Sequence, residues 1–154
     1  SHSYGYGLVT YQTAYLKANF PVEYLACLLT SVKSNLDKAA TYLADCRSMA
    51  IKVLPPDVNR SMSNFGVPAP SDVPLGVSLP HGSPGAITFG LSAVRNVGSG
   101  LVEHIVTERD EHGAYEDFYD FCQRVNTQVL NNDIQVIFPA AFASAKPVFP
   151  MPRA

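Results

Sequence analysis

The sequence predicts a mainly α-helical protein with a small β element, and three observations lead to that prediction. From residue 4 to residue 49, apolar residues recur at three- and four-residue spacing, as they do in amphipathic helices. Short β-prone runs at 51–54 and 86–89 border a segment rich in proline, serine and glycine. A Gly-Ser-Gly sequence at 98–100 separates two further apolar runs of helical spacing. We therefore expect a helical region, a loop-rich region and a helix-hairpin-helix, in that order.

Three helices are expected in residues 1–50. Leu8, Tyr11 and Tyr15 fall on one face of a helix over residues 4–19. Proline is favoured in a first helical turn, so Pro21 opens a second helix, which ends at the break of residues 30–35. Residues 36–49 place small and apolar side chains on one side and charged ones elsewhere, which predicts a third helix.

Residues 51–89 are expected to consist mostly of loops. The run 51–54 is β-prone, and Pro55 and Pro56 end it because proline cannot donate a hydrogen bond to a neighbouring strand. The other candidates for extended structure are residues 65–67, 77–79 and 86–89.

Residues 97–100 form the most informative pattern in the chain. Glycine takes positive φ freely, so Gly98 and Gly100 predict a tight reversal that leaves backbone N–H groups uncovered. At the start of a following helix, such groups favour a phosphate oxygen. A tight helical turn with no ligand is the alternative, and the residues alone leave it open. The predicted DNA-binding residues, none of which reads a base sequence, are Arg95, Val97, Gly98, Ser99 and Gly100.

Composition narrows the classes of function. The net charge is −2, so any DNA contact must be local rather than spread over a basic domain. The carboxylates are scattered and the histidines lack zinc-ligand spacing, so we expect no catalytic centre, metal or cofactor in this chain. No apolar run reaches the roughly 20 residues that span a bilayer, which predicts a cytoplasmic protein without membrane contact.

The three cysteines are widely spaced in the sequence, which predicts buried free thiols at Cys27, Cys46 and Cys122.

Residues 1–21, with the sequence SHSYGYGLVTYQTAYLKANFP, resemble the alpha (catalytic) subunits of bacterial DNA polymerase III, the family C replicative polymerases. By residue chemistry alone, Ser1, His2 and Ser3 favour an N-cap of the first helix. The resemblance extends to about residue 131, in family order, through residues 23–25, 28–31, 44–47, 53–59, 89–91 and 118–122.

The resemblance implies that residues 1–50 are the end of the polymerase fingers, with Ser1, His2 and Ser3 near the incoming nucleotide and the template. It implies a loop-rich segment with short strands at 51–89 and a helix-hairpin-helix at 90–131 that follows the backbone of duplex DNA. The parent would be a DNA-directed DNA polymerase that uses Mg²⁺, primer-template, dNTPs and other replisome subunits. Its catalytic aspartates lie in the palm, so this chain would be a piece of a longer protein without them.

Two departures from the family pattern stand out. Residues 132–154 lack the next family helix and are rich in alanine and proline, which predicts a disordered tail. We hypothesise that the reading frame slips near Asn132; an intact frame through a natural stop in the coding DNA would refute this. Residues 67–85 form a proline- and serine-rich insert, which we expect to be a variable surface loop.

Two other classes of function stay open. The first is a helix-hairpin-helix module of a DNA repair nuclease or ligase, which flanking acidic metal ligands or an adenylation lysine would reveal. The second is a non-catalytic interaction domain in which the glycines only make a turn. A lack of salt-sensitive DNA affinity would favour that second class.

Overall fold

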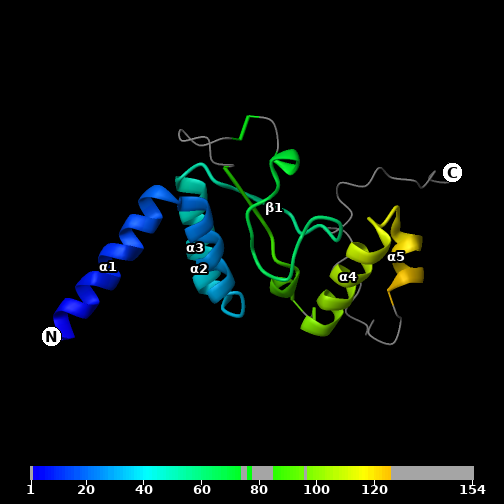
Figure 1. The fold of residues 1–154 in the computed structure, drawn as a ribbon, viewed down its shortest axis with the longest axis horizontal. Coiled ribbons are helices and arrows are strands. Elements are labelled where there is room, and N and C mark those ends of the chain that lie inside the picture. Colours follow the sequence, from blue (N-terminus) through cyan, green and yellow to red (C-terminus); the bar gives the residue numbers. More distant parts are fainter. Residues whose placement is uncertain (1, 74–75, 78–84, 96, 126–154) are drawn as a thin grey trace. The chain divides into compact units, whose positions relative to one another are not determined.

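The computed structural model describes residues 2–73, 76–77, 85–95 and 97–125 (Figure 1). The chain divides into two compact units. Unit 1 consists of Ser1–Val53 and Gly66–Ile87, and unit 2 of Leu54–Phe65 and Thr88–Ala154. Helices predominate beside one small sheet, so the predicted mainly α class with a small β element is confirmed. The predicted tail at 132–154 and much of the predicted insert at 67–85 lie outside the described residues.

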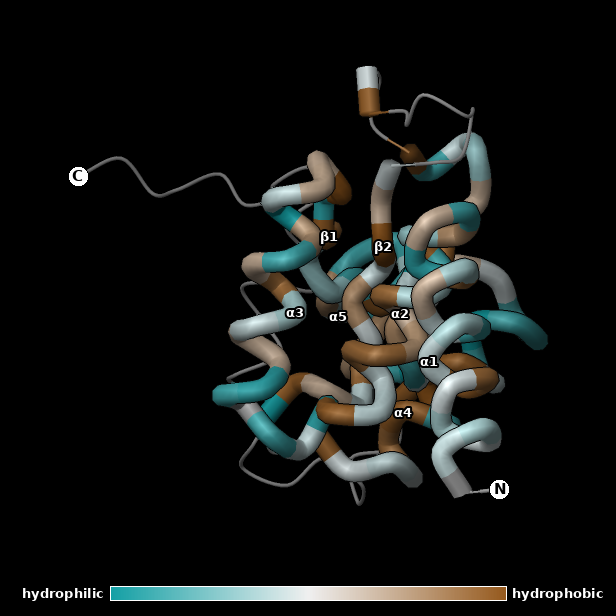
Figure 2. Tube along the Cα trace, turned by 90° about the vertical axis from the view of Figure 1, so that its left-hand side faces the viewer, coloured by the Kyte–Doolittle hydropathy of each residue, from teal (hydrophilic) through white to brown (hydrophobic). Residues whose placement is uncertain are grey.

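Three helices form most of unit 1, as the apolar spacing predicted. They are α1 (His2–Asn19), α2 (Pro21–Ser31) and α3 (Leu36–Ser48). Figure 2 colours most of α2 brown, the colour of hydrophobic residues. This helix contributes half of the buried hydrophobic residues described in unit 1, namely Val22, Leu25, Ala26 and Leu29.

Local chemistry explains where these helices begin. Pro21 occupies the first turn of α2, where a missing N–H costs no hydrogen bond because that group has no acceptor within the helix. Asn35 caps α3, and its side-chain oxygen accepts a hydrogen bond from the backbone N–H of Lys38 at 3.1 Å. The break predicted between α2 and α3 therefore ends at a capping residue.

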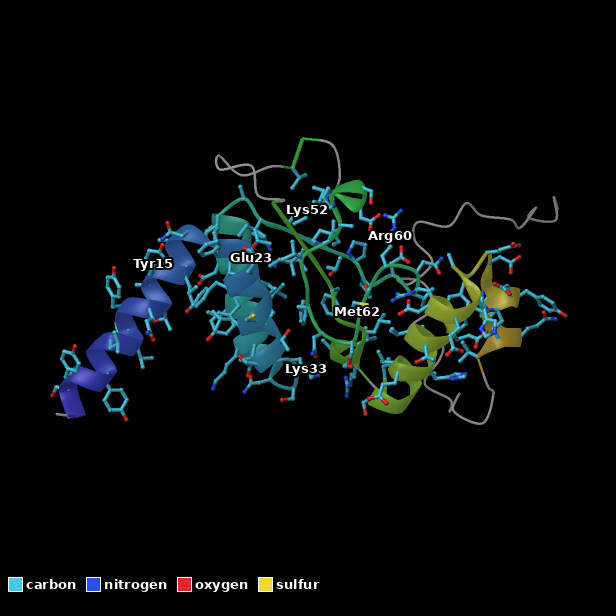
Figure 3. All side chains as sticks on the ribbon, in the orientation of Figure 1. Tyr15, Glu23, Lys33, Lys52, Arg60 and Met62 are labelled. Atoms are coloured by element: carbon cyan, nitrogen blue, oxygen red, sulfur yellow. The ribbon has the colours of Figure 1, made fainter. Side chains whose placement is uncertain are left out.

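Helix α1 forms as predicted, yet the described residues do not cover its apolar face. The residues Leu8, Tyr11 and Tyr15 are 49%, 67% and 51% exposed, and Tyr15 is labelled in Figure 3. The side chain of Lys17 forms an ion pair with Asp45 of α3 at 3.3 Å. Periodicity thus located the helix without indicating what, if anything, packs against it.

The sheet is smaller than the sequence predicted. It pairs β1 (Lys52–Leu54) with β2 (Ala86–Thr88), and a 3₁₀ helix, η1 (Pro70–Asp72), lies between them in the chain. Residues 65–67, a candidate for extended structure, form only an isolated bridge at Gly66, since Pro68 soon follows with no N–H to donate. Most of the strand predicted at 77–79 lies outside the described residues.

Unit 2 has a hydrophobic core built around two helices, α4 (Ser99–His112) and α5 (Phe118–Arg124). A second 3₁₀ helix, η2 (Leu91–Ala93), precedes α4. The Asp117 side chain caps α5 by accepting a hydrogen bond from the N–H of Asp120 at 2.8 Å. The buried cluster consists of Val58, Leu91, Leu101, Val102, Ile105, Tyr115, Phe121 and Val125.

The cysteines are free thiols, and the prediction that all three are buried is wrong for one of them. Cys46 is buried and Cys122 is half-buried, whereas Cys27 is exposed on α2. Burial raises the pKa of the Cys46 thiol, and the neighbouring Asp45 carboxylate raises it further. Cys46 is therefore held as the unreactive protonated thiol. The interpretation failed at Cys27 because the buried face of α2 is the one formed by Leu25, Ala26 and Leu29.

Tyr115 is a buried aromatic residue of unit 2 whose hydroxyl and ring both have partners. Its side chain is 3% exposed, and its hydroxyl donates a hydrogen bond to the carbonyl of Ile105 at 2.9 Å. Its ring lies edge-on to Phe121, with 5.0 Å between the centroids. Burial raises the pKa of Tyr115 to about 12.

We expect the free energy of unfolding to fall as the pH rises from 10.0, the ordinary pKa of tyrosine, to about 12. In this interval the folded state binds more protons at Tyr115 than the unfolded chain does. The stabilisation that comes from the raised pKa of Tyr115 is therefore fully present below pH 10.0 and is lost as the pH rises to about 12. The loss approaches about 1.4 kcal/mol per pH unit. Urea unfolding across this range measures it, and Tyr115→Phe removes this component. An identical alkaline dependence in Tyr115→Phe contradicts the assignment.

Candidate nucleic-acid interface

The predicted hairpin lies in unit 2 between η2 and α4. The chain turns after Leu91, whose carbonyl accepts a hydrogen bond from the N–H of Val94 at 3.1 Å. The carbonyl of Val94 then accepts one from the N–H of Val97 at 3.2 Å. Val94 and Val97 pack partly buried against the core cluster. Two successive tight turns therefore reverse the chain and deliver it to the start of α4 at Ser99.

The predicted role of the glycines in this reversal is wrong. Gly98 has φ −72° and ψ 148°, and Gly100 is a helical residue of α4. The described glycines with positive φ are Gly76 and Gly113 instead. Turns at residues 91–97 already reverse the chain, so Gly98 needs only the extended conformation of an N-cap residue.

Neither glycine of the hairpin is required by the packing of unit 2. A Cβ atom added at Gly98 or at Gly100 would meet nothing within 4 Å. Their backbone conformations also tolerate a side chain, since neither has positive φ. The fold itself therefore gives no reason for glycine at either position, and an approaching ligand would benefit from the missing side chains.

The first backbone N–H groups of α4 are open to solvent. Gly98, Ser99 and Gly100 are exposed, and no side chain caps the helix. The first N–H that bonds within this region is that of Val102, which donates to the carbonyl of Gly98 at 3.2 Å. In the described part of the chain, the N–H groups of residues 98–101 have no acceptor. Together with the positive end of the helix dipole, these donors form an environment that favours an anion.

The side chains around this helix start are compatible with an anion. Arg95 is exposed and forms no ion pair with any residue that the structure describes. Ser99 is exposed and places its hydroxyl in the first turn of α4, which has no acidic residue. The nearest acidic residue of the helix is Glu103, which is exposed about one turn beyond Ser99, and Glu108, Asp110 and Glu111 are about two turns or more away.

The other predicted site residues lie in unit 1. Ser1, and with it the N-cap position favoured by residue chemistry, lies outside the described residues. His2 is the first residue of α1, and Ser3 follows it as an exposed residue of the first helical turn. Their predicted place near a nucleotide and template stays a prediction.

Sequence reasoning missed the side chains that hold the hairpin in place. Arg109 of α4 donates to the carbonyls of Val58 and Ser61 at 3.2 and 2.9 Å, and its side chain is 11% exposed. The sequence does indicate that Arg109 faces the core, because it follows Leu101 and Ile105 on one helical face at a spacing of four residues. A charged residue on an otherwise buried face of a helix requires buried partners.

Two classes of site are not represented among the residues the structure describes. No three histidine, cysteine, aspartate or glutamate side chains of residues 2–73, 76–77, 85–95 and 97–125 are grouped as metal ligands. Within the same residues, every helix is too short or too polar to span a lipid bilayer.

The chain is similar in sequence to a motif family and to several known proteins. The helix-hairpin-helix motif family matches residues 50–139. Proteins named DNA polymerase III subunit alpha are 45% identical over 134 residues in Mycobacterium tuberculosis, 48% over 134 in Saccharopolyspora erythraea and 43% over 131 in Deinococcus radiodurans. These matches cover 85–87% of this chain but only 9–10% of each relative, so the chain spans about a tenth of their length. The chain therefore belongs to the helix-hairpin-helix motif family, and its relatives are alpha subunits of DNA polymerase III.

Proposed function

We propose that this chain binds the backbone of duplex DNA without regard to sequence, as part of a replicative DNA-directed DNA polymerase. The observation that supports this most strongly is the set of N–H groups at residues 98–101, which have no acceptor in the described chain and begin with the exposed residues Gly98, Ser99 and Gly100. A phosphate oxygen satisfies such donors and gains from the helix dipole. Phosphate binding also accounts for glycine at positions 98 and 100, where the packing does not require it, because the missing side chains let the phosphate approach the backbone.

The proposed DNA contact is local and needs few positive charges. Arg95 adds a positive charge beside the helix start, and the hydroxyl of Ser99 adds a donor. Phosphate contacts of this kind position a duplex but carry no sequence information. A chain of net charge −2 binds DNA in this way because the favourable charges are concentrated at one point.

The polymerase context extends the proposal beyond the hairpin. The relatives are named for a DNA polymerase subunit, so we infer that the full-length protein extends a primer-template with dNTPs and Mg²⁺, alongside other replisome subunits. Within it, Ser1, His2 and Ser3 would lie near the incoming nucleotide and the template. We assign no catalytic residue to this chain, and its share of the activity is to hold DNA.

Replacing Gly98 and Gly100 by alanine separates binding from folding. The added methyl groups have open space, so we expect the free energy of unfolding to stay within about 1 kcal/mol of the unmodified chain. They also hold a phosphate off the N–H groups, so duplex affinity should fall about tenfold. Fluorescence anisotropy with a labelled duplex at several salt concentrations measures the affinity.

The salt dependence identifies the contact that is lost. A phosphate contact whose loss also removes the Arg95 charge should reduce the slope of log affinity against log salt concentration by about 0.9, whereas loss of N–H contacts alone should lower the affinity with little change of slope. Equal affinity and equal slope for the alanine variant and the unmodified chain would remove the hairpin from the proposed interface. Binding that prefers one duplex sequence would contradict the backbone mode.

A further inference from the structure

The short segment of residues 57–63 in unit 2 contacts the chain on both sides of the hairpin, and we call it the brace. On the side before the hairpin, the carbonyls of Met62 and Ser63 accept hydrogen bonds from the N–H groups of Leu91 and Ser92 at 2.9 and 3.0 Å. The hydroxyls of Ser63 and Ser92 also share a hydrogen bond of 2.6 Å. The brace therefore fixes η2, the element that leads into the hairpin.

Gly90 permits this close approach. A Cβ atom at Gly90 would lie 2.6 Å from the carbonyl carbon of Asn64 and 2.7 Å from the backbone nitrogen of Phe65. Cβ atoms essentially never approach other heavy atoms this closely, so any side chain here would push the segment after the brace away from η2. The rings of Phe65 and Phe89, whose centroids lie 4.7 Å apart, fasten the two chains just beyond this point.

On the side after the hairpin, the brace holds α4 through Arg109. The guanidinium donates to the carbonyls of Val58 and Ser61, and a third contact joins its Nη2 to the sulfur of Met62 at 3.2 Å. Met62 is labelled in Figure 3. Arg109 lies roughly 15 Å along α4 from Ser99 at 1.5 Å per residue, so it is distant from an anion at the helix start.

The brace is itself a rigid turn. The hydroxyl oxygen of Ser61 accepts from the N–H of Asp57 at 3.0 Å, and the Asp57 carboxylate accepts from the N–H of Asn59 at 2.8 Å. The Asn59 side chain exchanges two hydrogen bonds with the backbone of Tyr115, at 2.9 and 2.8 Å. A stiff segment that holds both flanks of a hairpin fixes the angle between them.

We propose that the brace is a positioning device for DNA binding, with Arg109 and Ser63 as positioning residues that set the direction of the N–H groups at residues 98–101. The inference rests on the proposed function of the hairpin. Neither residue contacts the DNA in this account. Each acts through the elements that carry the donors, η2 in the case of Ser63 and α4 in the case of Arg109.

The variants Arg109→Lys and Ser63→Ala test the brace in the full chain. Lysine keeps the positive charge but lacks the planar fork that reaches two carbonyls and a sulfur at once. We expect three- to tenfold weaker binding to a labelled duplex, measured well below the melting temperature. We also expect the amide resonances of Gly98 and Gly100 to shift without DNA. Arg47→Lys, at an exposed arginine of α3, is the matched control and should change neither.

The outcomes separate the two levels of the proposal. A variant that melts earlier but keeps the affinity and the glycine resonances of the unmodified chain shows that the brace only stabilises the fold, which overturns the inference. If Arg109→Lys does not fold, Ser63→Ala, which removes one hydroxyl, decides in the same way. An unmodified chain that fails to bind duplex DNA overturns the proposed function itself, whereas a binding chain with unaffected variants overturns the brace alone.

Discussion

The double variant Gly98→Asp, Gly100→Asp should lose duplex affinity by roughly 100-fold, or about 2.7 kcal/mol. Two carboxylates would then occupy the positions that a phosphate approaches, and like charges repel strongly at such distances. The side chain of an aspartate at the N-cap position would also accept hydrogen bonds from the free N–H groups of α4. These donors would then no longer be available to a phosphate, and the site would carry a negative charge that repels DNA.

The same variant should be at least as stable as the unmodified chain. Aspartate is a favoured N-cap residue, and acidic residues in a first turn interact well with the helix dipole, so we expect a gain of up to about 1 kcal/mol. Thr107→Asp with Gln123→Asp adds the same charge at exposed positions of α4 and α5 and serves as the control. Similar losses in both double variants would show that the net charge of the chain, and not the hairpin, governs binding.

The variant Arg124→Met should destabilise unit 2 by about 3 kcal/mol and lower its melting temperature by roughly 10 °C. The Arg124 side chain is 17% exposed, and it pairs with the carboxylates of Glu108 at 3.3 Å and Asp120 at 3.1 Å. Burial by itself would lower the pKa of Arg124, but the hydrogen bonds to these carboxylates outweigh it and raise the pKa. The guanidinium is therefore always charged in the folded state.

Arg124 also satisfies the end of α4. Its Nη2 donates to the carbonyls of Glu108 and Gly113, at the C-terminal end of the helix, at 3.0 and 2.8 Å, and its guanidinium lies 4.4 Å from the ring centroid of Tyr115. Removing it takes the guanidinium away from those carbonyls and from both carboxylates, which line a small polar pocket of about 300 Å³.

Urea unfolding of Arg124→Met beside Arg47→Met checks this prediction. Arg47 is an exposed arginine of α3, so its replacement should change the stability by less than about 0.5 kcal/mol. Arg124→Lys keeps the charge and should recover only part of the loss, since lysine cannot serve the carboxylates and carbonyls together. Equal stabilities for the two methionine variants would show that the network around Arg124 contributes nothing.

How far the sequence predicted the fold depends on the range of the interactions concerned. The helices of unit 1 follow from local spacing and from residues such as Pro21 and Asn35, whose effects act within one turn. At residues 65–67 only an isolated bridge forms, and periodicity did not reveal that Phe65 packs its ring on Phe89. Local rules located elements well and said little about what lies against them.

The candidate site shows the same division. The positions of Gly98 and Gly100 were predicted, but their conformations were not, because the turns that reverse the chain form at residues 91–97. Arg109 was overlooked because its partners, Val58 and Ser61, are about fifty residues away in the chain. The four-residue spacing from Ile105 placed Arg109 on the buried face, but the sequence around it did not identify those carbonyls as its partners.

A titration of the isotope-labelled chain with a short duplex, followed by amide nitrogen–proton correlation spectra, tests the central claim most directly. We predict that the resonances of Gly98, Ser99, Gly100 and Leu101 shift in a saturable way, that duplexes of unrelated sequence give the same pattern, and that added salt reverses the shifts. Saturable shifts elsewhere in the chain, with these four amides unmoved, would contradict the assignment of the helix start of α4 as the place where this protein meets DNA.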